Sequence, residues 1–104
     1  MASLATIKLN YRQGMEQARR LGELAEKLRE EGDRQLEDMI SNLNTNWKGE
    51  NAQAYLIKCR RLQKNIQKNA NQLSKASEVV RTIVKNTYDA EMASYRIAQE
   101  RTYR

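Results

Sequence analysis

The feature that most constrains the fold is a heptad spacing of apolar residues in the second half of a chain that contains no proline. Alternating steps of four and three residues run from Tyr55 to Ala90, which is about five repeats of a register typical of helices that pack lengthwise on other helices. We expect the helix-pairing seam to consist of Tyr55, Leu62, Ile66, Leu73, Val80 and Ile83. Asn69 falls at one of the same positions, where a polar residue tends to fix the register of a helical pair.

The first half carries a similar but weaker stripe, which predicts a second amphipathic helix. Its small members, such as Gly14 and Ala18, allow another helix to approach closely. Three leucines beside the stripe widen the apolar surface beyond what one neighbouring helix covers. The stripe comprises Ile7, Tyr11, Gly14, Ala18, Leu21, Ala25, Leu28, Gly32, Gln35, Met39 and Asn42, and the flanking leucines are Leu24, Leu36 and Leu43.

Between the two patterns lies Trp47-Lys48-Gly49, preceded by residues that favour helix ends. Gly49 has access to backbone angles that other residues avoid, and Trp47 brings a large rigid surface to the end of the apolar pattern. We therefore predict an all-α fold, an antiparallel two-helix hairpin with a central Trp-X-Gly turn in a single domain, 1–104. Helix one is expected at about 6–43, the turn at about 44–49, helix two at about 50–93, and a C-terminal tail at about 94–104 that frays unless a partner holds it.

Helices of about 35 residues are roughly 50 Å long, and two of them side by side leave part of their apolar surface uncovered. Such a surface favours association. We therefore expect a four-helix bundle dimer, formed by self-pairing or with a similar helical hairpin.

Several functional classes find no support in the composition. Cys59 is the single cysteine and the chain has no histidine, so neither a disulfide within the chain, a cysteine–histidine metal site nor a cysteine–histidine catalytic pair is expected. There is no glycine-rich phosphate loop, and we expect neither an enzyme nor a cofactor. The sequence contains no apolar run of about eighteen residues and no signal peptide, so export would need another route.

The formal charge of +6 lies wholly in the second half. Eight basic and eight acidic residues precede Glu50, whereas eleven basic and five acidic residues follow from there. The basic side chains of the second half fit a solvated outer face, an acidic protein partner such as a toxin domain or a partner hairpin, or a nucleic acid or anionic lipid. A basic coiled coil that binds nucleic acid is thus the alternative from another functional class. Tight DNA binding that falls steeply with salt concentration would favour it.

The chain resembles the WXG-hundred, or early-secreted-antigen-like, family through Trp47, Gly49, Ala52 and Tyr55, together with its length and heptads. The resemblance implies a hairpin that dimerises head to tail. It also implies synthesis in the cytoplasm of a Gram-positive bacterium or mycobacterium and export by the type VII secretion system without a cleaved signal. The implied function is that of a non-catalytic secretion substrate or targeting partner, with the Trp-X-Gly turn as part of the signal read by the secretion ATPase.

In that family the second part of the signal is a tyrosine followed four residues later by Asp or Glu. Here Tyr88 is followed by Met92 and Tyr95 by Gln99, while Glu91 and Glu100 stand one place away from the expected positions. Either a partner supplies the acidic residue, or the element is degenerate and these residues serve as a partner contact. The departure leaves open a dedicated chaperone that escorts the N-terminal helical domain of an LXG-type toxin.

Overall fold

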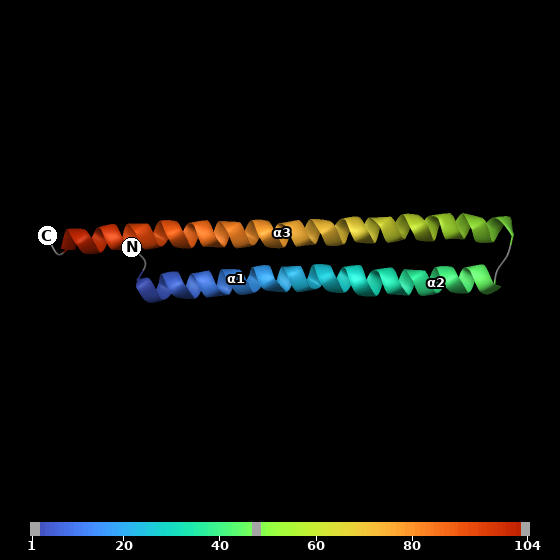
Figure 1. Ribbon diagram of the computed structural model, residues 1–104, viewed down its shortest axis with the longest axis horizontal. Helices are drawn as coiled ribbons and strands as arrows, with labels where there is room; N and C mark the ends of the chain where they lie inside the picture. Colours follow the sequence, from blue (N-terminus) through green and yellow to red (C-terminus); the bar gives the residue numbers. More distant parts are fainter. Residues whose placement is uncertain (1–2, 47–48, 103–104) are drawn as a thin grey trace. The chain divides into compact units, whose positions relative to one another are not determined.

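The computed structural model describes residues 3–46 and 49–102, which form four helical elements (Figure 1). These are α1 (Leu4–Lys27), the π-helical turn η1 (Leu28–Gly32), α2 (Asp33–Asn46) and α3 (Glu50–Thr102). Helices α1 and α2 continue one another through η1, and together with α3 they make a two-helix hairpin. The described ranges contain no strand, and the predicted all-α hairpin is confirmed.

The helix ends follow local chemistry. The hydroxyl of Ser3 accepts a hydrogen bond from the backbone N–H of Thr6 at 3.2 Å, a helix cap that lets α1 begin at Leu4. Helix α3 continues to Thr102, beyond the boundary near residue 93 that the fading apolar stripe suggested. No glycine or proline follows Gly49, so nothing in the backbone chemistry stops the helix earlier.

The chain divides into two compact units, and each pairs one segment of the first helical arm with one segment of α3. In the terminal unit, 1–21 and 75–104, the two helices approach closely because the facing residues are small. Ala18 is fully buried, and its carbonyl accepts a hydrogen bond of 2.6 Å from the hydroxyl of buried Ser77. Gly14 lies so close to Val84 that a Cβ on the glycine would come within 2.6 Å of a valine methyl.

The turn unit, Gly22–Ser74, holds most of the larger buried residues. Ile40 and Leu36 from α2 are buried, as are Ala52 and Ala70 from α3. A Cβ placed on Gly32 would lie 2.9 Å from a side-chain carbon of Ile66, so this glycine also marks a close contact between the helices.

The apolar stripe predicted for the first arm is wrong beyond the π-helical turn η1. Up to Gly32 the predicted positions face α3, but beyond it Leu36, Ile40 and Leu43 take the inner face in place of Gln35, Met39 and Asn42. A π-helical turn accommodates one residue more than an α-helical turn, so every later position is displaced by one place. Met39 is consequently 53% exposed, whereas its neighbour Ile40 is 2% exposed.

Helix α3 also uses a face slightly rotated from the predicted seam. Ile66, Leu73 and Val80 are half-buried as expected, but Tyr55, Leu62 and Ile83 are exposed. Asn69, expected within the seam, is exposed too. The predicted positions 55, 62, 69, 76 and 83 are each replaced on the inner face by the next residue in the sequence. These residues are Leu56, Gln63, Ala70, Ser77 and Val84. Most of these are small or polar, and they allow the closer approach of the helices.

Candidate interaction site

Gly49, one residue of the predicted motif, stands directly before α3. Its φ is +117°, in a region that side-chain-bearing residues rarely adopt, although a Cβ there would meet nothing within 4 Å. Its carbonyl then accepts a hydrogen bond from the backbone N–H of Gln53 at 3.1 Å, which starts α3. Glu50 places a negative charge in the first turn, where it complements the helix dipole. Trp47, the other residue of the predicted motif, lies outside the described residues.

Two of the C-terminal candidates, Tyr88 and Glu91, belong to a contact within the terminal unit. The ring of Tyr88 lies against that of Tyr11, with 4.5 Å between the ring centres and 40° between the planes. Both tyrosines and Glu91 line a small cavity of about 120 Å³, which Ile7 and Val84 close on the apolar side. Tyr11, Tyr88 and Glu91 are each half-buried. Tyr88 therefore packs within the terminal unit, and part of its side chain is also exposed to solvent.

The other two candidates, Tyr95 and Glu100, lie further along α3. Tyr95 is half-buried and Glu100 exposed. The side-chain amide of Gln99 donates a hydrogen bond of 2.8 Å to the phenolic oxygen of Tyr95. Gln99 stands at the fourth place after the tyrosine, where the resemblance stated above would imply an acidic residue, and its side chain is a neutral amide.

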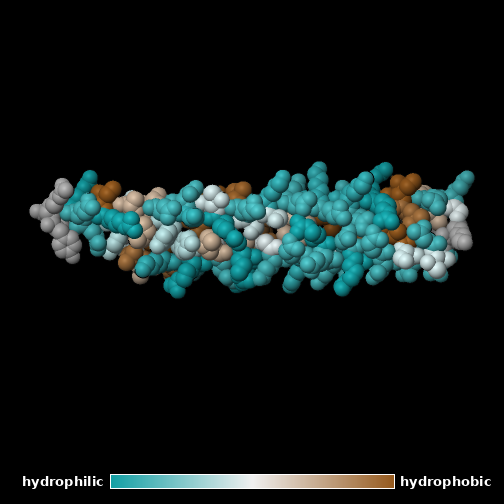
Figure 2. All heavy atoms as spheres, viewed as in Figure 1, coloured by the Kyte–Doolittle hydropathy of each residue, from teal (hydrophilic) through white to brown (hydrophobic). Residues whose placement is uncertain are grey.

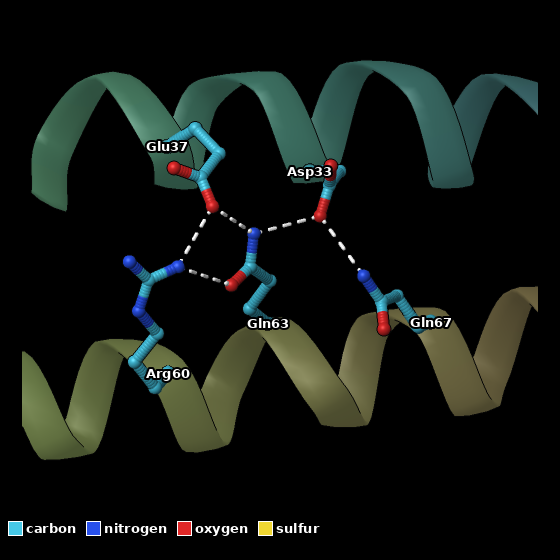
Figure 3. Close-up of polar contacts among 5 residues, drawn as sticks. All are labelled: Asp33, Glu37, Arg60, Gln63 and Gln67. Carbon is cyan, nitrogen blue, oxygen red and sulfur yellow. Dashed lines mark hydrogen bonds and ion pairs between the residues drawn. The ribbon is translucent and has the colours of Figure 1, made fainter. Parts of the chain in front are cut away.

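A cluster of five polar side chains joins α2 to α3 in the turn unit (Figure 3). The amide nitrogen of Gln63, a residue only 8% exposed, donates to a carboxylate oxygen of Asp33 at 2.8 Å and of Glu37 at 2.9 Å. Arg60 donates to the same Glu37 oxygen at 2.8 Å and to the amide oxygen of Gln63 at 3.2 Å. Gln67 donates to Asp33 at 3.1 Å. Every polar atom of the Gln63 side chain therefore has a partner, as a buried amide requires.

The polar cluster, defined as Asp33, Glu37, Arg60, Gln63 and Gln67, also affects ionisation. The hydrogen bond from Gln63, followed by that from Arg60, lowers the pKa of Glu37 below its ordinary value of 4.5. The sequence analysis did not identify this cluster, because Gln63 is one place away from the predicted seam. The sequence pattern that could have indicated the cluster is Gln63 beside the predicted seam, together with Asp33 and Glu37 in the other arm as acceptors for its amide.

Exposed apolar residues recur at one heptad position of α3. We use the term apolar stripe for Tyr55, Leu62, Ile83 and Ile97, which are separated by multiples of seven residues. Each is at least 50% exposed. Leu24 on α1 and Met39 on α2 add further exposed apolar surface in the turn unit. The face in Figure 2 is mostly hydrophilic, with separate groups of hydrophobic residues.

Within residues 3–46 and 49–102, no group of three or more acidic or cysteine side chains is placed to hold a metal ion. Cys59 is a free, half-buried thiol. None of the described helices has a stretch both long and apolar enough to cross a lipid bilayer.

Comparison with known proteins gives one match. The model of the family WXG100, described as proteins of 100 residues with WXG, matches residues 6–92. The match spans both helical arms and the turn between them. No curated protein and no solved structure matches the chain.

Proposed function

Because this chain belongs to the WXG100 family, whose small helical proteins are associated with type VII secretion, we propose that it is a non-catalytic secretion substrate or targeting partner that pairs with a second helical hairpin. The observation that carries the proposal is the apolar stripe of α3. Four large apolar residues fall at one heptad position and are each at least half exposed, which favours contact with another helix.

The second hairpin is either another copy of this chain or a similar protein. Pairing through these exposed apolar residues would complete a four-helix bundle. Burying the exposed part of such a side chain contributes about 1 kcal/mol, so the four positions together offset part of the free-energy cost of association.

Export is proposed to depend on two elements. Trp47 and Gly49 form the first, the turn motif read by the type VII secretion ATPase. The second consists of Tyr88, Glu91, Tyr95 and Glu100 on α3, which act as a C-terminal signal or a partner contact. In this proposal the protein is made in the cytoplasm of a Gram-positive bacterium and exported without a signal peptide.

Analytical ultracentrifugation of the purified chain tests the pairing. The expected species is a dimer, and the double variant Leu62→Lys and Ile83→Lys should raise its dissociation constant at least about tenfold. Ile57→Lys is the control for a single lysine placed elsewhere on α3, since Ile57 is 59% exposed but lies about 140° around α3 from Leu62. A rigid monomer at high concentration that also fails to bind hairpins encoded beside it contradicts the proposal.

Export is tested separately in the native host. Trp47→Ala should abolish appearance of the protein outside the cell while its cytoplasmic level and its dimer remain unchanged. Normal export of this variant contradicts the role of the turn.

A second candidate role is the escort of an LXG-type toxin through its N-terminal helical domain. The observation that favours it is Gln99, whose neutral amide binds Tyr95 at the place where the family signal has an acidic side chain. If the partner carries the acidic signal, Gln99→Glu makes export independent of the partner. Export that still requires the partner after this substitution counts against a missing acid as the reason for escort.

A further inference from the structure

A shallow groove lies along one side of α3, near its beginning. It has a volume of about 360 Å³ and is lined by Leu56, Ile57, Arg60, Arg61 and Lys64, which we term the basic groove. Ile57 in this lining is 59% exposed, the most exposed of the large apolar side chains described. Because Ile57 and Leu62 lie about 140° apart around the helix, the basic groove is separate from the apolar stripe.

The charge of this segment is one-sided. No acidic residue occurs from Asn51 to Ser77, whereas six basic residues do, namely Lys58, Arg60, Arg61, Lys64, Lys68 and Lys75. Arg60 is held by Glu37 in the polar cluster. Arg61 and Lys64, on the rim of the groove, form no ion pair with any residue that the structure describes. An occupant that brings carboxylates therefore meets uncompensated positive charge.

The dimensions favour a helix as the occupant. The lining residues follow one another at positions 56, 57, 60, 61 and 64, a path of eight residue steps or about 12 Å along α3. Two turns of a partner helix span the same length and present side chains at the same spacing. A lipid surface is a poorer fit because membrane-bound helices need a broad apolar face, and here one isoleucine is the exposed apolar centre. Nucleic acid gains nothing from that isoleucine, since it is bound chiefly through its phosphates.

From these observations we infer that the basic groove binds an acidic amphipathic helix of another protein, with an apolar side chain of that helix on Ile57 and its carboxylates at Arg61 and Lys64. This surface is additional to the pairing of hairpins through the apolar stripe. It gives the hairpin a second binding face.

The test uses a designed helical peptide of sixteen residues with leucines on one face and flanking glutamates, together with a peptide in which every glutamate is glutamine. Fluorescence anisotropy with the full chain should show the glutamate peptide binding at least about tenfold more tightly. Arg61→Glu with Lys64→Glu, and separately Ile57→Asn, should each weaken that binding at least about tenfold. Lys85→Glu with Arg96→Glu is the control, because it makes the same change in net charge on exposed residues of the terminal unit.

Three outcomes overturn the inference. They are equal binding of the two peptides, an equal loss in the control variant, and binding of phosphatidylglycerol vesicles or duplex DNA through Arg61 and Lys64 when neither peptide binds. Sedimentation of the same variants reports the dimer independently, since they leave the apolar stripe intact. Failure of the groove is thereby distinguished from failure of the proposed pairing.

Discussion

At the scale of single residues, the helices of the terminal unit approach closely because residues with no side chain or a small one lie between them. Gly14 faces the two methyl groups of Val84, and a branched valine has little rotameric freedom to move aside. Ala18 and Ser77 meet one helical turn away through a buried hydrogen bond to the backbone. The glycine is therefore retained at a cost of about 1 kcal/mol in helix propensity relative to alanine, because it permits this approach.

We predict that Gly14→Ala lowers the free energy of unfolding by about 1 kcal/mol. Overpacking against Val84 costs about 1–3 kcal/mol and outweighs the gain in helix propensity. Thermal unfolding followed by circular dichroism measures the change. The double variant Gly14→Ala and Val84→Ala gives the new methyl group space and should recover part of the loss. If the single variant is more stable than the wild type, the close contact does not exist in solution.

The polar cluster predicts a dependence on pH that belongs to one carboxyl group. The pKa of Glu37 is lowered in the folded chain by Gln63 and then by Arg60. A lowered folded-state pKa means that the ionised form contributes stability above about pH 4.5, and that this contribution is lost as the pH falls further through the folded-state pKa. Glu37→Gln should therefore flatten the decline in melting temperature between about pH 4.5 and pH 3. Glu30→Gln is the control, and a decline unchanged by Glu37→Gln refutes the assignment.

At the scale of elements, the heptad pattern predicted the helices correctly but did not fix which face of α3 points inward. Two candidate rows flank Cys59, Ile66, Leu73 and Val80. One row contains the larger apolar residues Tyr55, Leu62 and Ile83, and the other contains Gln63, Ala70 and Ser77. Hydrophobicity favours the first row, but the second is buried. Ala70 and Ser77 are small and permit close packing on the other arm, and Gln63 is satisfied by its hydrogen bonds to Asp33 and Glu37.

The displaced stripe of α2 has a different cause. A prediction from hydrophobic periodicity assumes a regular α-helix. The residues Leu28–Gly32 do not by themselves indicate a π-helical turn, because the close contact of Gly32 with Ile66 is not known from the sequence. The leucines beside the predicted stripe, Leu36 and Leu43, were the available hint, since both lie one place after a predicted position. The motif at Gly49 was recognisable because its positive φ requires a particular residue type.

The π-helical turn leads to a prediction from deletion. Removing Glu31 should convert η1 to a regular α-helical turn and leave Leu36 and Ile40 facing α3, because the extra residue is the one lost. Helicity and melting temperature should change little. Removing Gln17 from regular α1 instead rotates every preceding residue by about 100°, and should destabilise the chain by several kcal/mol. Equal effects of the two deletions, measured by circular dichroism, contradict the role of η1.

At the scale of the whole molecule, the hairpin contains two kinds of exposed surface on one helix. The apolar stripe of α3 suits a second hairpin, and the basic groove suits an acidic helix. Among the described residues, most side-chain hydrogen bonds that join the two arms lie in the turn unit. They are those of the polar cluster and the hydrogen bond of 2.9 Å from Arg29 to Asn71. These hydrogen bonds fix the register of the two helices in the turn unit, and none of them involves a residue beyond Thr87.

Truncation after Thr87 tests how these roles are divided. It removes Tyr88, Tyr95 and Ile97, so Tyr11 loses its ring contact and the apolar stripe loses its last member. The polar cluster and the buried alanines of the turn unit remain, and the signal of circular dichroism per residue should stay strongly helical. The dissociation constant of the dimer, or of the complex with a cognate hairpin, should rise at least about tenfold by ultracentrifugation. Ile97→Glu in the full chain separates the stripe from the lost length, and unchanged association in both variants shows that pairing does not involve the end of α3.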